Sequence, residues 1–184
     1  MLDLSKVSVC LISKDSIYPP EVLANTAKYP FGEILVLTHS DSPYRKYELF
    51  AKAKYDVLAY SDDDAICPWK ELAELSNPDI INLAIKQGHF DQYKNMRMTM
   101  GLGWGAIFPK QILASLSKYT QIYGFDAIFQ RETERILTYL NFPQNRFILP
   151  IADLPSAYAE DRLWRQPQHY DNIKIVEERC KGLL

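Results

Sequence analysis

Short apolar runs alternate with amphipathic segments along the first third of the chain. Val7–Ser13, Glu33–Thr38 and Asp56–Tyr60 are rich in β-forming apolar residues, which is typical of buried strands. Between these runs lie Glu21–Lys28, directly after two prolines, and Tyr44–Lys54, with apolar residues on one face; both are typical of helices. The order strand, helix, strand, helix, strand predicts an α/β fold, with a mostly parallel sheet covered by helices on both faces.

The rest of the chain continues without a repeat, a low-complexity tract or a linker, so residues 1–184 are expected to form one domain. The polar stretch Gln87–Asn95 is expected to be a loop. The charged segment from Glu160 onward has Ile173, Ile175 and Val176 as its few apolar anchors. The further expected elements are helices over Pro68–Leu75, Pro109–Lys118 and Phe125–Tyr139, and strands over Asp79–Ile85 and Arg146–Ile151.

Charge and cysteine content narrow the class of protein. The 21 basic residues are balanced by 23 acidic ones, which argues against a nucleic-acid-binding protein because such proteins carry a basic field. The apolar run Val7–Ile12 is too short for a membrane span or a signal peptide. Cys10, Cys67 and Cys180 are far apart, odd in number and without metal-ligand spacing, so we expect reduced, mostly buried thiols in a cytoplasmic protein.

Three consecutive aspartates, Asp62-Asp63-Asp64, directly follow the third predicted strand. Crowded like charges repel one another, so the cluster favours a bound cation, and carboxylate oxygens suit Mg²⁺ or Mn²⁺. The alternative is an exposed acidic turn in which Asp62 or Asp64 caps the next helix. In parallel sheets, ligands bind outside the carboxyl ends of the strands, where Ser13-Lys14-Asp15 and His39-Ser40-Asp41 are also expected.

The segment Gly101–Phe108 has three glycines within five residues. Glycine is conformationally costly inside regular structure, so this density predicts close backbone approach or positive φ. Trp104, within this segment, is a candidate to stack on a sugar ring or, alternatively, a core aromatic.

Two enzyme classes fit the acidic cluster poorly. Haloacid-dehalogenase-type phosphatases continue Asp-x-Asp-x with Thr or Val, whereas this chain has Ile66, and its aspartates follow the third strand rather than the first. Nucleotidylyltransferases place a glycine-rich phosphate loop after the first strand, whereas Leu11–Ser16 contains no glycine.

The order of several motifs resembles that of GT-A nucleotide-sugar glycosyltransferases. The resemblance rests on the strand end Ile12–Asp15, the helix start Tyr44-Arg45, the aspartate triplet, the glycine-rich segment and Gly124-Phe125-Asp126. It implies a GT-A type, Rossmann-like fold. The C-terminal stretch Trp164–His169 is also similar to the Trp-to-His spacing of exostosin-like C-terminal transferase domains.

This resemblance implies a divalent metal, Mn²⁺ or Mg²⁺, that bridges the two phosphates of a nucleotide-sugar donor and neutralises charge on the leaving group. Asp64 is the expected main ligand, Asp62 contacts the metal and the ribose or sugar hydroxyls, and Asp63 contributes through water or holds the loop. His169 is a further candidate ligand. Residues expected at the nucleotide or diphosphate are Ser13, Lys14, Arg45 and Arg165, with Arg162 as a further candidate.

Asp126 is the candidate general base, which would take the proton of the acceptor hydroxyl. The alternative role is the N-cap of the following helix, a position that aspartate favours. Glu132 and Glu134 on the same helix are expected to be surface charges. A single base favours inversion of the anomeric configuration, whereas the exostosin-like resemblance favours retention, and both remain open.

The sequence therefore predicts a metal-dependent glycosyltransferase of the hexosyl or N-acetylhexosaminyl type. Its donor is expected to be a UDP-sugar and its acceptor a hydroxyl group of a glycan or glycoconjugate. Two alternatives stay open: a non-catalytic nucleotide-sugar-binding domain and a metal-dependent phosphohydrolase.

Overall fold

The computed structural model describes residues 2–13, 18–40, 44–93, 97, 101–155 and 168–184. Six strands form the main sheet, in the order β2-β1-β3-β6-β5-β7, and two short strands form a separate antiparallel ribbon, β4-β8. The strands are β1 Val7–Ile12, β2 Glu33–Leu37, β3 Val57–Asp62, β4 Ala65–Ile66, β5 Asn82–Ile85, β6 Ala106–Pro109, β7 Asn145–Ile148 and β8 Ala152–Asp153.

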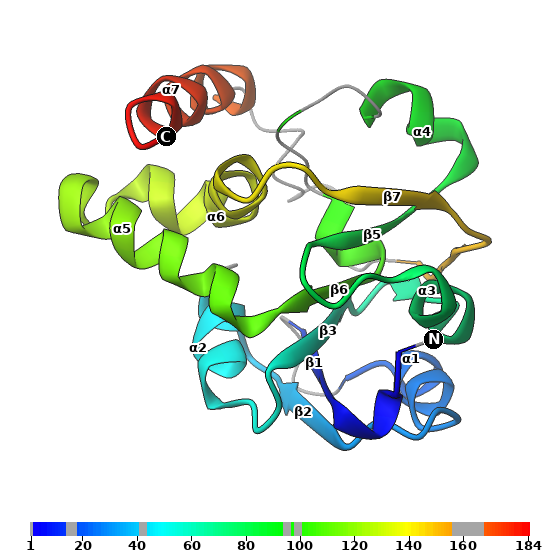
Figure 1. The fold of residues 1–184 in the computed structure, drawn as a ribbon. Helices are drawn as coiled ribbons and strands as arrows, with labels where there is room; N and C mark the ends of the chain where they lie inside the picture. Colours follow the sequence, from blue (N-terminus) through cyan, green and yellow to red (C-terminus); the bar gives the residue numbers. More distant parts are fainter. Residues whose placement is uncertain (1, 14–17, 41–43, 94–96, 98–100, 156–167) are drawn as a thin grey trace.

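Helices lie on both faces of the main sheet (Figure 1), as the alternating pattern predicts. On one side lie α1 and α3; on the other lie α2, α5 and α6, with α7 packed along α6. The helices are α1 Pro20–Thr26, α2 Arg45–Lys52, α3 Trp69–Leu75, α4 Gln87–Tyr93, α5 Ala114–Tyr123, α6 Ala127–Leu140 and α7 His169–Lys181, with 3-10 turns at Leu4–Lys6, Gly101–Trp104 and Lys110–Leu113.

The two faces of β1 and β3 explain the two hydrophobic cores, because successive side chains of a strand point to opposite faces. Leu58 and Tyr60 pack with the α2 and α6 side, together with Phe50. Ala59 packs with the α1 and α3 side, around the fully buried Trp69. All six residues of β1 are buried, which accounts for its continuous apolar run.

The fold is α/β and its main sheet is mostly parallel, as predicted, with one antiparallel strand. Strand β6 runs antiparallel to both of its neighbours, β3 and β5. Among the other pairs of the main sheet, β1 pairs in parallel with β2 and β3, and β5 with β7. The carboxyl ends of β1, β2 and β3 therefore meet at one edge, where Ile12 lies between Leu37 and Asp62 in register.

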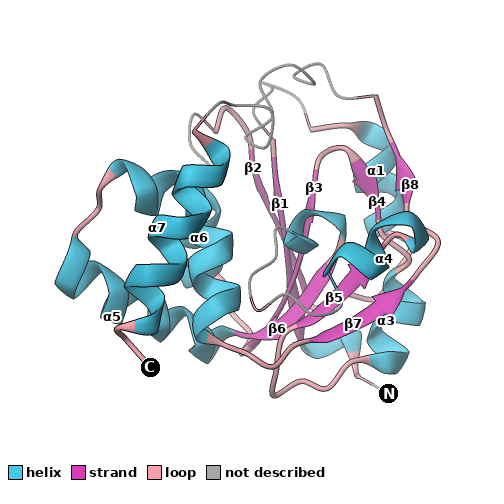
Figure 2. Ribbon diagram, turned by 90° about the horizontal axis from the view of Figure 1, so that it is seen from above, coloured by secondary structure: helices cyan, strands magenta, loops and turns pink. Residues whose placement is uncertain are grey.

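One expectation about secondary structure is wrong. Gln87–Tyr93 is the helix α4 rather than a loop. No element is predicted for the charged segment His169–Lys181, which forms the helix α7 alongside α6 (Figure 2). Its buried residues Val176 and Cys180 are four apart and lie in the same core as Phe129 of α6.

The expectation of reduced, mostly buried cysteines is consistent with the structure. Cys10, Cys67 and Cys180 are free and buried. Within the described ranges, no helix combines the length and the apolar character needed to cross a membrane.

Candidate functional site

The aspartate triplet lies at the carboxyl edge of the sheet, as its position in the sequence predicts. Asp62 is the last residue of β3, and Asp63 and Asp64 form the turn into β4. The backbone N–H of Leu154, just after β8, donates to the carbonyl oxygen of Asp64 at 2.8 Å. The ribbon β4-β8 thus ties the acidic turn to a segment about 90 residues later in the chain.

The ends of β1 and β2 meet the triplet at this edge. The N–H of Ser13 donates to the carbonyl of Leu37 at 2.9 Å, and that of Ser40 donates to the carbonyl of Ser13 at 3.0 Å. The hydroxyl of Ser13, which is buried, donates to the carboxylate of Asp63. Ser13 therefore lies at the acidic turn and fixes the side chain of Asp63.

Asp62 is held from the α2 and α6 side of the sheet. The hydroxyl of Tyr60, two residues earlier on the same face of β3, donates to Oδ1 of Asp62. The other oxygen, Oδ2, lies so close to Gly103 that a Cβ at that position would be 1.8 Å away. The carboxylate of Asp62 is thus clamped between a buried phenol and the Gly101–Trp104 turn.

Two buried hydroxyls lie near the triplet on the opposite side of the sheet. Tyr18 and Ser61 are both buried, and their side chains lie close to each other. Burial raises the pKa of Tyr18, and the nearby charges of Asp62, Asp63 and Asp64 raise it further. Sequence reasoning missed Tyr18, which lies three residues after Asp15 and belongs to no recognised motif.

The donor set at this edge suits a hard divalent ion, since it consists of carboxylate oxygens. In the described residues, however, no three His, Cys, Asp or Glu side chains gather as a metal site. Mg²⁺ sites of this kind use one or two carboxylates and take their other oxygens from a substrate's phosphates and water. The residues present fit a metal that is shared with a diphosphate.

A buried ion pair lies beneath Asp62, and it corrects the expectation that Glu132 and Glu134 are surface charges. The ammonium of Lys46 on α2 pairs with the carboxylate of Glu134 on α6, and their side chains are only 5% and 11% exposed. Glu132 is buried as well and pairs with Arg135 at 2.9 Å. Both glutamates are internal because α6 lies between the sheet and α7, which covers its outer side.

Asp126 caps α6. Its Oδ1 accepts from the N–H of Phe129 at 2.9 Å, and its Oδ2 pairs with Arg179 of α7 at 2.7 Å. Although partial burial raises the pKa of Asp126, these hydrogen bonds and the Arg179 charge outweigh it and hold that pKa below its usual value. A lowered pKa weakens a carboxylate as a base, so the capping role is the one that the geometry favours; the catalytic role stays a prediction.

The remaining predicted residues lie around this edge or outside the described residues. Arg45 begins α2 and pairs with Glu48 at 3.8 Å. Trp104 is half-buried, with the Lys86 ammonium 5.1 Å and the His89 ring 4.8 Å from its ring centroid. Lys14, Arg162 and Arg165 lie outside the described residues, as does the side chain of His169, whose backbone begins α7.

Comparison with solved structures places this fold among glycosyltransferases, although sequence comparison alone does not. No family model matches the chain, and no curated protein gives a significant sequence match. A mannosyltransferase from Pyrobaculum calidifontis, in complex with GDP-Man and Mn²⁺, superposes with a TM-score of 0.61 at 11% identity over 95% of this chain. The chain spans 64% of the length of that enzyme.

Two further structures show the same likeness. Glucosyl-3-phosphoglycerate synthase from Mycobacterium tuberculosis, with Mg²⁺ and UDP, matches with a TM-score of 0.52 at 12% identity, over 96% of this chain and 79% of the enzyme. A glycosyltransferase involved in glycosylation of the major capsid of PBCV-1 matches with a TM-score of 0.51 at 11% identity, over 84% of this chain and 96% of that one. The chain therefore has the α/β fold of these glycosyltransferases, while the likeness to exostosin-like domains stays a prediction.

Proposed function

We propose that this chain is a metal-dependent glycosyltransferase, which transfers a sugar from a nucleoside diphosphate to a hydroxyl acceptor. The observation that carries the proposal is the acidic turn Asp62–Asp64 at the carboxyl edge of a sheet whose fold is shared with glycosyltransferases. Structures with this fold include complexes with Mn²⁺ and GDP-Man and with Mg²⁺ and UDP. We assign the donor as a UDP-sugar, of the hexosyl or N-acetylhexosaminyl type, and the acceptor as a glycan or glycoconjugate.

The residues of the acidic turn have different roles in this proposal. Asp64 is the main metal ligand. The hydroxyls of Tyr60 and Ser13 hold the carboxylates of Asp62 and Asp63 beside it. Asp62 contributes its other oxygen to the metal or to a donor hydroxyl. When bound, the divalent ion supplies positive charge that stabilises the departing diphosphate.

Other residues complete the donor site in this proposal. Arg45 at the start of α2 is close in sequence to the edge of β2 and pairs with the donor's phosphates as a guanidinium. Lys14 and Arg165 add charge at the diphosphate, and His169 adds an imidazole ligand to the metal. Trp104, in the same turn as Gly103, offers an aromatic surface to the acceptor sugar.

The general base of an inverting reaction is assigned to Asp126, and this part of the proposal competes with its capping role. Asp126→Asn keeps an N-cap, because asparagine caps helices as well as aspartate does, but removes the basic carboxylate. Loss of transfer with unchanged donor binding supports the base role. Full transfer activity in the variant assigns Asp126 to capping alone.

The experiment that tests the proposal is a thermal-shift screen of nucleotide sugars with and without Mn²⁺. A ligand that binds only the folded protein stabilises it by RT ln(1 + [L]/Kd), so a matching donor at about 100 times its Kd adds about 2.7 kcal/mol. We expect a UDP-sugar to give a large shift that disappears with a chelator. No metal-dependent shift with any nucleotide sugar would contradict the proposal.

One observation favours a second candidate, a non-catalytic nucleotide-sugar-binding domain. Both carboxylate oxygens of Asp126 are engaged and its pKa is lowered, which leaves a weak base at the only position assigned that role. Metal-dependent donor binding without hydrolysis, and without transfer across an acceptor panel, would favour this candidate.

A further inference from the structure

The buried pair Lys46–Glu134 joins two helices beneath the acidic turn. Lys46 is on the first turn of α2 and Glu134 is in the middle of α6, and these residues are 88 positions apart in sequence. Lysine and glutamate are rarely buried unless they are paired, and taking both from water costs more than most such pairs return. A simple apolar contact would hold α2 against α6 at least as well, so the pair calls for a reason beyond stability.

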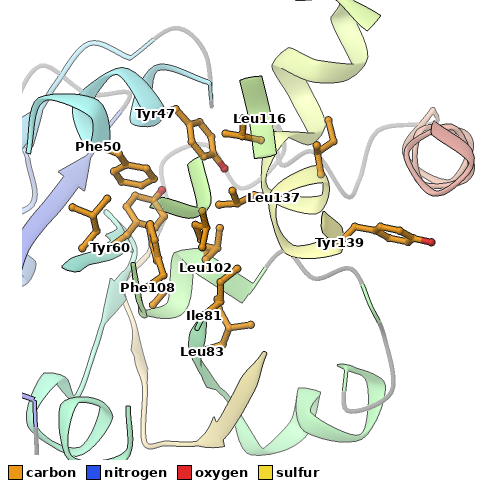
Figure 3. Close-up of a cluster of buried hydrophobic side chains, with 14 of the residues drawn as sticks. Tyr47, Phe50, Tyr60, Ile81, Leu83, Leu102, Phe108, Leu116, Leu137 and Tyr139 are labelled. Atoms are coloured by element: carbon orange, nitrogen blue, oxygen red, sulfur yellow. The ribbon is translucent and has the colours of Figure 1, made fainter. Parts of the chain in front are cut away.

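The pair contacts the side chain that holds Asp62. The ammonium of Lys46 lies 4.6 Å from the centroid of the Tyr60 ring, and the hydroxyl of the same ring donates to Asp62. Phe50 packs edge-on against Tyr60 and also against Phe108, with ring centroids 5.4 Å apart in each pair. The phenol of Tyr60 therefore has little freedom to turn. Figure 3 shows the rings of Phe50, Tyr60 and Phe108 gathered in one group, with Tyr47 close by.

We propose that Lys46 and Glu134 are positioning residues for the donor site, which act through Tyr60 to fix the carboxylate of Asp62. This inference rests on the proposed function, because it assigns the pair a role in binding the nucleotide donor with its metal. Glu134 holds the ammonium over the ring, and the ammonium holds the ring and draws electron density from it. The phenol hydroxyl then donates more strongly to Oδ1 of Asp62, which fixes the orientation of the carboxylate.

Tyr60 and Gly103 together fix the position of the Asp62 side chain. Its Oδ1 accepts from Tyr60 and its Oδ2 lies against Gly103, so the side chain has a single position before a ligand arrives. Preorganised ligands bind more tightly, because less conformational freedom is lost on binding. Loosening Tyr60 therefore weakens donor binding without removing any group that touches the donor.

The first test compares variants by calorimetric titration of UDP with Mn²⁺ present. Tyr60→Phe removes only the hydroxyl, and the double variant Lys46→Met, Glu134→Leu replaces the ion pair by apolar side chains of similar size. We expect each to weaken UDP binding by about tenfold, the worth of one hydrogen bond to a charged group. The melting temperature of the double variant is expected to stay equal or rise, because apolar replacement of a buried pair is often neutral or stabilising.

The triple variant separates positioning from a structural role. If the pair acts through the Tyr60 hydroxyl, then Tyr60→Phe added to the double variant weakens binding no further, because the two changes are coupled. Independent effects that multiply to about a hundredfold would overturn the proposal. Unchanged affinity in Tyr60→Phe would also overturn it, and this single variant decides the matter if the double variant fails to fold.

The matched control is Tyr47→Phe, which removes another buried hydroxyl from α2. That hydroxyl has no hydrogen-bond partner within the described residues, so its loss leaves UDP affinity unchanged. A wild-type protein that does not bind UDP or GDP with Mn²⁺ would overturn the proposed function and this inference together. Wild-type binding that the Tyr60 and Lys46–Glu134 variants retain in full would overturn this inference alone.

Discussion

The carboxylate of Asp62 lies directly against the backbone of Gly103, in the turn before β6. A Cβ at position 103 would be 1.8 Å from Oδ2 of Asp62, well inside the distance at which real atoms meet. Gly105, two residues later, has φ +133° and would place a Cβ 2.3 Å from the sulfur of Cys67. Two of the three glycines of this segment are therefore explained, Gly103 by close approach and Gly105 by both close approach and positive φ.

Gly103→Ala is expected to destabilise the protein by about 2 kcal/mol, because Asp62 and the turn must move apart to admit the methyl group. It is also expected to weaken metal-dependent UDP binding, since Asp62 leaves its position. Urea unfolding and calorimetry measure the two effects. The control is Gly88→Ala in α4, where a Cβ meets nothing within 4 Å and alanine favours the helix, so stability should rise by up to about 1 kcal/mol.

Tyr47→Phe is expected to leave stability unchanged or raise it by up to about 1 kcal/mol. The Tyr47 hydroxyl is buried among α2, α6 and the sheet without a hydrogen-bond partner in the described residues, so it bears a desolvation cost that phenylalanine avoids. Thermal unfolding measures the difference. A loss of more than about 1 kcal/mol would mean that the hydroxyl has a partner that stabilises the fold.

Lys46→Met alone is expected to cost about 3–5 kcal/mol at neutral pH, because it leaves the Glu134 carboxylate buried and unpaired. Burial raises the pKa of Glu134 above 4.5 even against the pull of Lys46, and removal of Lys46 raises that pKa further. The folded state then binds the proton more tightly than the unfolded one, so the stability of the variant falls as pH rises above about 4.5. Adding Glu134→Leu should remove this pH dependence; its persistence in the double variant would refute the assignment to Glu134.

The lowered pKa of Asp126 predicts that its contribution to stability depends on pH with the opposite sign. Its folded-state pKa is lowered below 3.8 despite the opposing effect of burial, by hydrogen bonds from Phe129 and Arg179. The stability that it contributes is present above about pH 3.8 and is lost as pH falls through the folded-state pKa. The stability difference between the wild type and Asp126→Asn should therefore shrink in acid, as measured by urea unfolding between neutral pH and pH 2. A constant difference would show that the Asp126 charge does not stabilise the fold.

The first half of the fold could be predicted because its strands are continuous apolar runs. Val7–Ile12 is buried along its whole length, so its sequence shows both the strand and the two covered faces. The same reasoning places the aspartate triplet at the sheet edge, since a parallel sheet brings the carboxyl ends of β1, β2 and β3 together.

Other elements give little local signal. The helix α4 is short and polar and contains Gly88, so only its packing beside β7 distinguishes it from a loop. The antiparallel direction of β6 depends on its pairing with β3 and β5, which an apolar run does not specify. The helix α7 has a weak signal among its many charges, since Ile173, Val176 and Cys180 recur at helical spacing.

The supports of the candidate site could not be predicted from sequence. A lysine on one helix and a glutamate on another, 88 residues later, each suggest solvent-facing charge. Only the packing of α2 against α6 brings Lys46, Glu134 and Tyr60 under Asp62. The N-cap role of Asp126 is among the roles that the sequence predicts, whereas its ion pair with Arg179 depends on the packing of α7 along α6.

Calorimetric titration of UDP in the presence of Mn²⁺, into the wild type and Asp64→Ala, tests the central claim most directly. The side chain of Asp64 lies in the turn after β3, and replacing it should leave the fold intact because its backbone carbonyl, which accepts from Leu154, is retained. Metal-dependent binding by the wild type and none by Asp64→Ala, at an unchanged melting temperature, is the predicted result. Equal binding of UDP by the two proteins would contradict a metal-dependent donor site at Asp62–Asp64.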